Sequence, residues 1–272
     1  AYSWDGIGHQ IVTQVAYDNL KPNVKTQVDA LIVVMNNDPD VVGLSADVKP
    51  YNFVTAGDWM DDMRKFDKQF NSWHYSDLPL DDDSLTTDGV AKFMDTNPSN
   101  NVHAIETFCL PTLKNSSAPI ADRARALGFF LHLAGDIHQP LHSSGFDAGG
   151  NTYKIDEVPT ADPDYPVKNL HLFWDGAYRY SYSDGQVTLA VPTFDKPRIS
   201  APGQDPIRSL ATLVETDFAP LDPKDGLDEN PADWALESRN IAAVFTYPAL
   251  NNQHTLTPED VKAAFRKYID PK

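Results

Sequence analysis

The 272-residue sequence contains a single cysteine and no long uninterrupted apolar run. One cysteine excludes an intrachain disulfide framework, so we interpret Cys109 as a small buried apolar residue. The longest apolar segments, ALIVVM and LGFFLHLAG, fall short of the roughly 20 residues that a membrane-spanning helix needs. Because 41% of the residues are hydrophobic, the chain can still bury a substantial core. The sequence therefore predicts a globular, water-soluble protein without a membrane anchor.

Basic residues are also scarce in this sequence. Lysine and arginine total 22 against 39 aspartates and glutamates, which gives a formal net charge of -17. This balance argues against a long basic groove that follows a polyanion. A nucleic-acid partner is still compatible with it, because divalent cations held by aspartates would make the local field positive. We therefore interpret part of the acidity as candidate metal sites.

Apolar residues recur at helical spacing through most of the first two thirds of the chain. This spacing predicts helices over residues 8–20, 24–35, 55–66, 102–113 and 122–138. We expect Pro111 to break the fourth of these helices and Asp122 to cap the fifth. Two late helices are expected over residues 232–247 and 257–269.

Between the helical segments, residues 143–168 are dense in glycine, proline and aspartate. This composition predicts a long surface loop, with a short hairpin around residues 151–155. Residues 185–194 favour another short strand pair. Since no internal repeat or linker divides the chain, we expect one mainly α, helical domain over residues 1–272, with long loops and a few short strands.

The segment HLAGDIHQPLH, residues 132–142, concentrates three of the eight histidines of the chain. His132 and Asp136 are four residues apart, so on a helix they project from one face and can reach a common ion. His171 and Asp175 in NLHLFWD repeat this spacing. One such pair occurs on any solvated helix face, but two pairs in apolar surroundings favour a divalent metal site.

Other histidines divide into candidate ligands and packed side chains. Pro140 cannot continue a helix, so it frees His142 to serve a second ion. His138 lies around the helix from His132 and Asp136, and we interpret it as a packed histidine, or one that supports a neighbouring ligand, rather than as a ligand itself. His103 and His254 have no acidic neighbour at ligand spacing, which favours solvated or helix-packing roles.

Two further candidates lie upstream, each among aromatic residues. These are Asp61 in DWMDDMR and His74 in SWHYSD, although Asp61 would by itself fit a helix surface. His9 ends the stretch WDGIGH at the start of the first expected helix. Its neutral ring could either cap that helix or bind a metal.

The motifs WDGIGH, DWMDDMR, WHYSD, HLAGDIHQPLH, GGN and NLHLFWD stand in the order found in the S1/P1 nuclease family. The sequence resembles that family over about residues 4–245. The resemblance implies a helical domain of the phospholipase C/P1 nuclease type that binds three zinc ions at the bottom of a cleft. Carried over motif by motif, it implies these ligands, with Asp136 shared between two ions: Trp4, His9, Asp61, His74, His132, Asp136, His142, His171 and Asp175.

The resemblance also implies the substrates and the residues that contact them. It implies hydrolysis of single-stranded DNA and RNA to 5′-phosphorylated products, with catalytic roles for Asp61 and Asp77. Tyr75 would stack on a nucleobase, with core packing as the alternative. Asn151 would touch a base edge, with a turn role as the alternative. The sequence leaves a 3′-nucleotidase activity open and indicates no obligate protein partner.

Two other functions fit the same residues less well. A zinc-dependent phospholipase C resembles this family in fold and metals, but the short gap between Trp4 and His9, and the last ligand Asp175, favour a nuclease. A non-catalytic zinc-binding protein is the third reading. It is disfavoured because structural zinc sites are closed, whereas three clustered ions imply open positions.

The first three residues, AYS, carry small side chains at the first and third places, as an export cleavage site does. We therefore expect a secreted or periplasmic protein whose mature chain starts at Trp4. A free α-amine there would complete the third zinc site, because an amine can deprotonate and bind whereas an internal amide binds poorly.

Overall fold

The computed structural model describes residues 4–64, 66–82, 84–155, 167–176, 180–183, 186–189, 206–217 and 229–247. The AYS segment, His254 and the expected helix over residues 257–269 lie outside these ranges, as do residues 156–166 of the expected loop and residues 185 and 190–194 of the second expected strand region.

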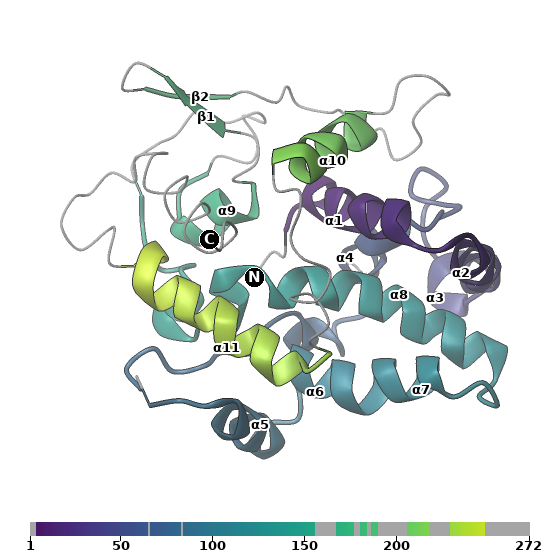
Figure 1. Ribbon diagram of the computed structural model, residues 1–272, viewed down its shortest axis with the longest axis horizontal. Coiled ribbons are helices and arrows are strands. Elements are labelled where there is room, and N and C mark those ends of the chain that lie inside the picture. The colour runs from purple at the N-terminus through teal and green to yellow at the C-terminus, as the bar shows by residue number, and fades with distance from the viewer. Residues whose placement is uncertain are drawn as a thin grey trace.

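The protein is mainly helical, as predicted, with helices arranged around the long helix α8 (Figure 1). The helices are α1 (Gly6–Asn19), α2 (Pro22–Met35), α3 (Pro39–Val42), α4 (Trp59–Met63), α5 (Thr87–Thr96), α6 (Asn101–Ala104), α7 (Leu110–Lys114), α8 (Ile120–Ile137), α9 (Leu170–Asp175), α10 (Pro206–Asp217) and α11 (Pro231–Ile241). Short 3₁₀ segments cover Thr55–Asp58, Asn71–His74, Pro140–Ser143 and Phe146–Ala148. Helices α3, α5 and α10 were not predicted.

Strands contribute little to the described part of the chain. β1 (Tyr180–Ser183) and β2 (Gln186–Leu189) form an antiparallel pair. The strand pair expected over residues 185–194 contains β2 but not β1, which precedes it, and residues 190–194 lie outside the described ranges. Of the hairpin expected around residues 151–155, the described residues show one antiparallel bridge, between Lys154 and Asn169.

Two details of the helix predictions were wrong. Pro111 does not break its helix, because a π-helical turn over Ile105–Cys109 leads directly into α7 and places the proline in the first turn, where its missing N–H is not needed. Asp122 does not cap α8, since that helix begins two residues earlier, after Pro119. The Asp122 carboxylate instead lies in the first turn, where the helix dipole favours a negative charge.

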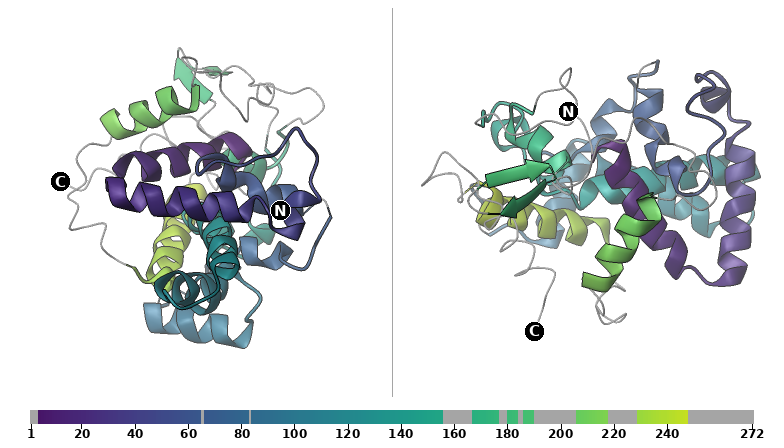
Figure 2. Two further views of the ribbon diagram at one scale, coloured as in Figure 1. Left: turned by 90° about the vertical axis from the view of Figure 1, so that its right-hand side faces the viewer. Right: turned by 90° about the horizontal axis from the view of Figure 1, so that it is seen from above.

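The main core forms where α8 packs against α2, α4 and α7 (Figures 1 and 2). Trp59, Phe129 and Met35 are buried here, and the predicted burial of Cys109 is confirmed. Gly128 permits this packing, because a Cβ atom there would lie 2.5 Å from the Trp59 ring.

A second, smaller apolar cluster surrounds α9. Leu141, Leu170, Phe173, Trp174 and Tyr247 belong to it. The last turns of α8 therefore belong to the main core, through Leu133 and Ile137, whereas α9 belongs to the smaller cluster. None of the described helices combines the length and apolar character needed to cross a membrane.

Candidate metal centre

Helix α8 supplies the central pair of the site, His132 and Asp136. Both side chains are fully buried, and His132 Nε2 lies 3.2 Å from Asp136 Oδ2. The Gly57 carbonyl, 2.6 Å from His132 Nδ1, accepts the proton of that nitrogen. The backbone therefore fixes the imidazole so that Nε2 faces the carboxylate, as in many metal sites.

Two more histidines reach Asp136 from distant segments. His74 Nδ1, at the end of the Asn71–His74 turn, lies 3.0 Å from Asp136 Oδ2 and 3.0 Å from His132 Nε2. His9 of α1 stacks on the His132 ring at 3.9 Å, with Nε2 3.4 Å from Asp136 Oδ1. His9 does not cap α1, because Asp5 accepts the capping bond from Gly8.

The approach of α1 to α8 depends on Gly135. A Cβ atom there would lie 2.9 Å from His9 Nδ1. Trp4 lies over the same residue, since its indole N–H donates to the Gly135 carbonyl at 2.9 Å. Asp61 of α4 completes this part of the site, because donor atoms of His9, Asp61 and His132 all lie within 4.8 Å of one another.

A second group consists of His142, His171 and Asp175. His171 Nε2 lies 3.5 Å from Asp175 Oδ2, and His142 Nε2 lies 3.8 Å from Asp175 Oδ1. Backbone carbonyls again orient both rings, because His142 Nδ1 lies 2.7 Å from the His74 oxygen and His171 Nδ1 lies 2.6 Å from the Gly149 oxygen. His142 Nδ1 is also 3.6 Å from Asp136 Oδ1, so the two groups are adjacent.

The Gly149 carbonyl reaches His171 through an unusual loop. Asp147, Ala148, Gly149 and Gly150 all have positive φ, with values of 47°, 53°, 63° and 78°. Such a conformation is costly for aspartate and alanine, and residues in it concentrate at functional sites. A Cβ atom at Gly149 would lie 2.7 Å from the Leu141 carbonyl, so this position requires glycine.

Burial and charge together perturb the ionisation of the cluster. Burial lowers the pKa of His9, and it lowers the pKa of His74 to about 4. Burial also raises the pKa of Asp175 well above its ordinary value. Asp136 behaves in the opposite way, because the neighbouring imidazoles outweigh burial and hold its pKa well below the ordinary value. Neutral imidazoles and an ionised carboxylate held this close together are the forms that bind a cation.

Several buried nitrogen and oxygen atoms of the cluster, each able to bind a metal ion, make no hydrogen bond to the described residues. These are both ring nitrogens of His9, His74 Nε2, Asp136 Oδ1 and Asp175 Oδ2. Buried polar atoms without a hydrogen bond are costly and call for a partner such as an ion. Imidazole and carboxylate donors without thiolate, in groups of three, fit zinc.

The expected packing role fits the geometry of His138. It is exposed, donates to the Ala134 carbonyl at 2.8 Å and packs against the Trp234 ring at a tilted angle, outside the metal-ligating groups of the described residues. His103 is half-buried on α6 and also lies outside those groups.

The expected substrate-contacting residues lie on segments next to the cluster. Tyr75 directly follows His74 and is half-buried. Asp77 has an exposed side chain and a positive φ of 37°, and its carbonyl lies 2.9 Å from where a Cβ of Gly145 would be. Asn151 donates from Nδ2 to the Ala148 carbonyl at 2.9 Å, a bond within its own turn.

Two polar residues at the site were not singled out from the sequence. Arg64 Nη1 lies 3.2 Å from Asp61 Oδ1, which places a cation beside a candidate ligand. Its position three residues after Asp61 on a helix was the available signal. Gln139, which follows α8, contacts Asp175 on α9, and no sequence spacing signals such a long-range contact.

The chain is similar in sequence to known proteins. Residues 4–268 match the family model for S1/P1 Nuclease. Nuclease S1 of Aspergillus oryzae is 25% identical over 175 residues, which cover 64% of this chain and 54% of that protein. Nuclease P1 of Penicillium citrinum is 26% identical over 173 residues, which cover 63% of this chain and 57% of that protein. The chain thus spans about half the length of the curated relatives it matches.

Proposed function

Because the chain belongs to the S1/P1 nuclease family, we propose that it is a zinc-dependent nuclease that hydrolyses single-stranded DNA and RNA to 5′-phosphorylated products. The observation that carries this proposal is the cluster of buried imidazoles and carboxylates, several of whose donor atoms make no hydrogen bond to the described residues. We further propose that the protein acts outside the cytoplasm, as a secreted or periplasmic enzyme.

Three zinc ions are proposed, with ligands from segments far apart in the chain. The first would take Asp61, His74, His132 and Asp136; the second His142, His171 and Asp175; the third Trp4, His9 and Asp136. Sharing of Asp136 is supported by its two oxygens, since Oδ2 faces His74 and His132 while Oδ1 faces His9.

Bound zinc supplies Lewis-acid polarisation of the phosphoryl oxygen and lowers the pKa of water. The side chains of the protein would hold and orient the substrate around this chemistry. Arg64 is proposed to contact a phosphate oxygen, because its guanidinium already lies beside Asp61. Asp61 and Asp77 are proposed as the carboxylates that orient the attacking water.

Recognition of the bases is assigned to Tyr75 and Asn151. The half-buried Tyr75 ring, next to His74, would stack on a nucleobase of any identity. Asn151 would contact a base edge, for which its amide must exchange the present bond to Ala148. Because the proposed ligands other than Trp4 and Asp61 are buried, the scissile phosphate must approach below the surface, which favours an unpaired strand over a duplex.

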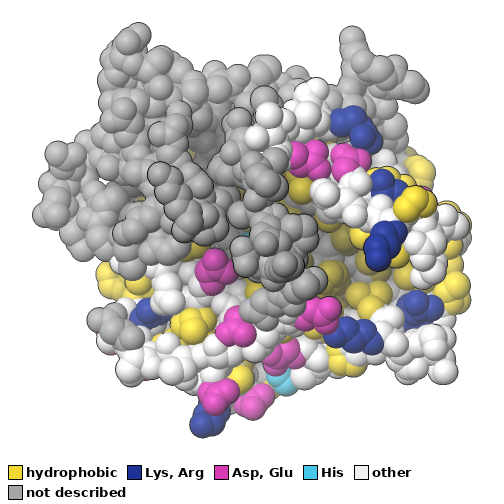
Figure 3. Space-filling view, viewed as in Figure 1, with side chains coloured by type: hydrophobic (Ala, Val, Ile, Leu, Met, Phe, Trp, Pro, Cys, Tyr) yellow, Lys and Arg dark blue, Asp and Glu magenta, His cyan; other side chains and the backbone are white. Residues whose placement is uncertain are grey.

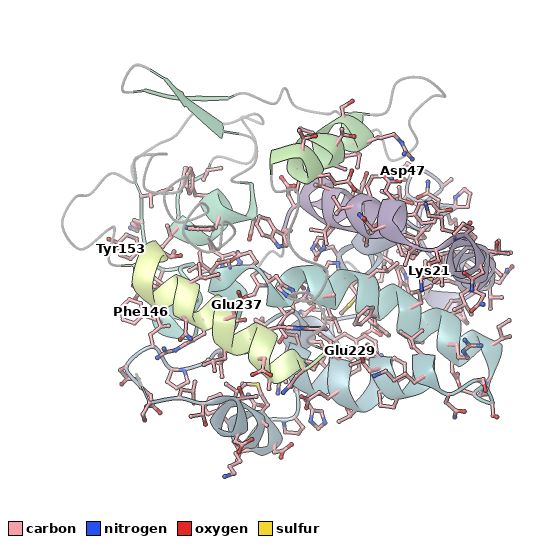
Figure 4. The ribbon with its side chains drawn as sticks, in the orientation of Figure 1. Lys21, Asp47, Phe146, Tyr153, Glu229 and Glu237 are labelled. Carbon is pink, nitrogen blue, oxygen red and sulfur yellow. The ribbon has the colours of Figure 1, made fainter. Side chains whose placement is uncertain are left out.

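The surface charge is consistent with attraction through bound metal. On the face shown in Figure 3, the described residues present acidic and basic side chains interspersed, without a continuous basic stripe. The positive field for a polyanion would then come from the bound ions themselves.

The test is an assay of the zinc-loaded protein on single-stranded DNA, single-stranded RNA and phosphatidylcholine, each with and without a chelator. We expect chelator-sensitive cleavage of both nucleic acids and intact phosphatidylcholine. Rapid hydrolysis of phosphatidylcholine with intact DNA and RNA would overturn the proposal in favour of a phospholipase C. Stable zinc binding with all three substrates intact would indicate a non-catalytic zinc protein.

A further inference from the structure

Gln139 is a buried neutral side chain between the two groups of ligands. It has no exposed surface, and it follows α8 in the segment that leads to His142. Its Nε2 donates to Asp175 Oδ1 at 2.7 Å, and its Oε1 accepts from the Leu141 N–H at 2.6 Å. Both ends of one amide are therefore used, one on α9 and one on the turn that carries His142.

The contact distinguishes the two oxygens of Asp175. Oδ1 accepts the Gln139 bond, while Oδ2 makes no hydrogen bond to the described residues and lies 3.5 Å from His171 Nε2. Oδ1 also lies 3.8 Å from His142 Nε2, but one of its lone pairs is already occupied by the amide. Oδ2 is therefore the oxygen with both lone pairs open.

The same amide organises the turn that holds His142. The bond from Leu141 to Gln139 Oε1 caps the Pro140–Ser143 turn, and the His142 N–H donates to the Gln139 carbonyl at 2.9 Å. A side chain that fixes both the turn and the carboxylate couples the positions of two proposed ligands of one ion.

We propose that Gln139 is a positioning residue: it leaves only Oδ2 of Asp175 available to the ion, and it fixes the position of Asp175 relative to His142. This inference rests on the proposed function, because it takes His142, His171 and Asp175 as ligands of one zinc. A carboxylate that binds through one oxygen occupies one coordination position instead of two. Gln139 would thereby keep a position at this ion open for substrate.

The test compares two substitutions of Gln139 with a matched control. Gln139→Met removes both hydrogen bonds at similar volume, whereas Gln139→Glu can still accept from Leu141 but cannot donate to Asp175 while ionised. Gln14→Met is the control, because Gln14 is equally buried and donates to Asp18 Oδ2 at 2.9 Å on α1, outside the metal-ligating groups of the described residues. Asp175→Asn serves as the reference for a damaged second site.

Zinc affinities are measured by titration against a chelator, and visible absorption is measured after cobalt substitution. We expect both Gln139 variants to bind one of the three ions about 10- to 100-fold more weakly than the wild type, with the other two unchanged. The cobalt band that Asp175→Asn removes should weaken in both Gln139 variants, because five-coordinate cobalt absorbs less than four-coordinate cobalt. Circular dichroism confirms folding, and Gln139→Glu keeps the test decisive if Gln139→Met does not fold.

Three outcomes separate the inference from the function on which it rests. Wild-type affinities and an unchanged cobalt band in both Gln139 variants would overturn the positioning role and leave the zinc sites intact. An equal loss in Gln14→Met would likewise overturn it, since any buried glutamine would then have the same effect. If Asp175→Asn binds zinc and cobalt as the wild type does, the proposed second zinc site itself fails.

Discussion

Asp136→Asn is the substitution with the largest expected effect on the site. Nitrogen atoms of His74, His132, His9 and His142 lie between 3.0 and 3.6 Å from its two oxygens. An asparagine keeps the shape and one acceptor oxygen, but it removes the negative charge and turns an NH₂ group toward these rings. Since Asp136 is proposed to bridge two ions, both should bind more weakly.

The size of the loss follows from the burial of the pair. Removing one partner from a buried charge cluster costs about 3–5 kcal/mol. At 1.4 kcal/mol for each factor of ten, this corresponds to roughly a hundredfold to a few thousandfold weaker binding for each of the two ions. The second ion, held by His142, His171 and Asp175, should remain bound.

His138→Ala is the control for this measurement, because His138 is exposed on the same helix end and packs on Trp234. Zinc per chain after dialysis, together with cleavage of single-stranded DNA, is measured for both variants. We expect about one zinc and no activity for Asp136→Asn, and full zinc content and activity for His138→Ala. Equal losses in the two variants would refute the bridging role of Asp136.

Three further outcomes follow from the packing and ionisation described above. Gly128→Ala should lower the free energy of unfolding by about 1–3 kcal/mol, because its Cβ meets the Trp59 ring at 2.5 Å; an unchanged melting temperature in excess zinc would contradict this packing. The Cys109 thiol, whose pKa burial raises to about 12, should react with a thiol reagent only after denaturation, and rapid labelling of the native protein would disprove its burial. In the metal-free protein, burial opposes the positive charge on His132. The neighbouring Asp136 carboxylate outweighs this effect and raises the pKa of His132 from 6.5 to about 9. The stability that the protonated His132 gains from Asp136 is fully present below pH 6.5 and is lost as the pH rises through 9. The urea concentration at the midpoint of unfolding should therefore be lower above pH 9. A higher midpoint above pH 9 would exclude this pair as the main contributor.

The parts of the site that depend on local spacing could be predicted from the sequence. The four-residue spacing of His132 and Asp136 fixes their common face on α8 whatever else the chain does. Pro140 likewise limits the helix, which ends at Ile137, and the following turn carries His142. In these cases a covalent constraint and a helix period decide the geometry, so no long-range contact is needed.

The parts that depend on distant backbone could not be predicted. The carbonyls of Gly57 and Gly149 orient His132 and His171, but any residue offers a carbonyl, so no side chain reveals them. Gln139 was hidden for a related reason, since its partner Asp175 lies on another helix. The continuation of the helix through Pro111 was not predicted, because helix propensity alone does not reveal the π-helical turn that precedes this proline.

The ligands proposed for the three ions come from Trp4 ahead of α1, from α1, α4, α8 and α9, and from two intervening turns, a spread from Trp4 to Asp175. Bound ions would join these segments as cross-links, closing long loops in a chain that has only one cysteine. Such cross-links respond to metal supply and to competing chelators, whereas disulfides respond to redox conditions. Resistance of this protein to proteolysis would then follow the free zinc concentration of its surroundings.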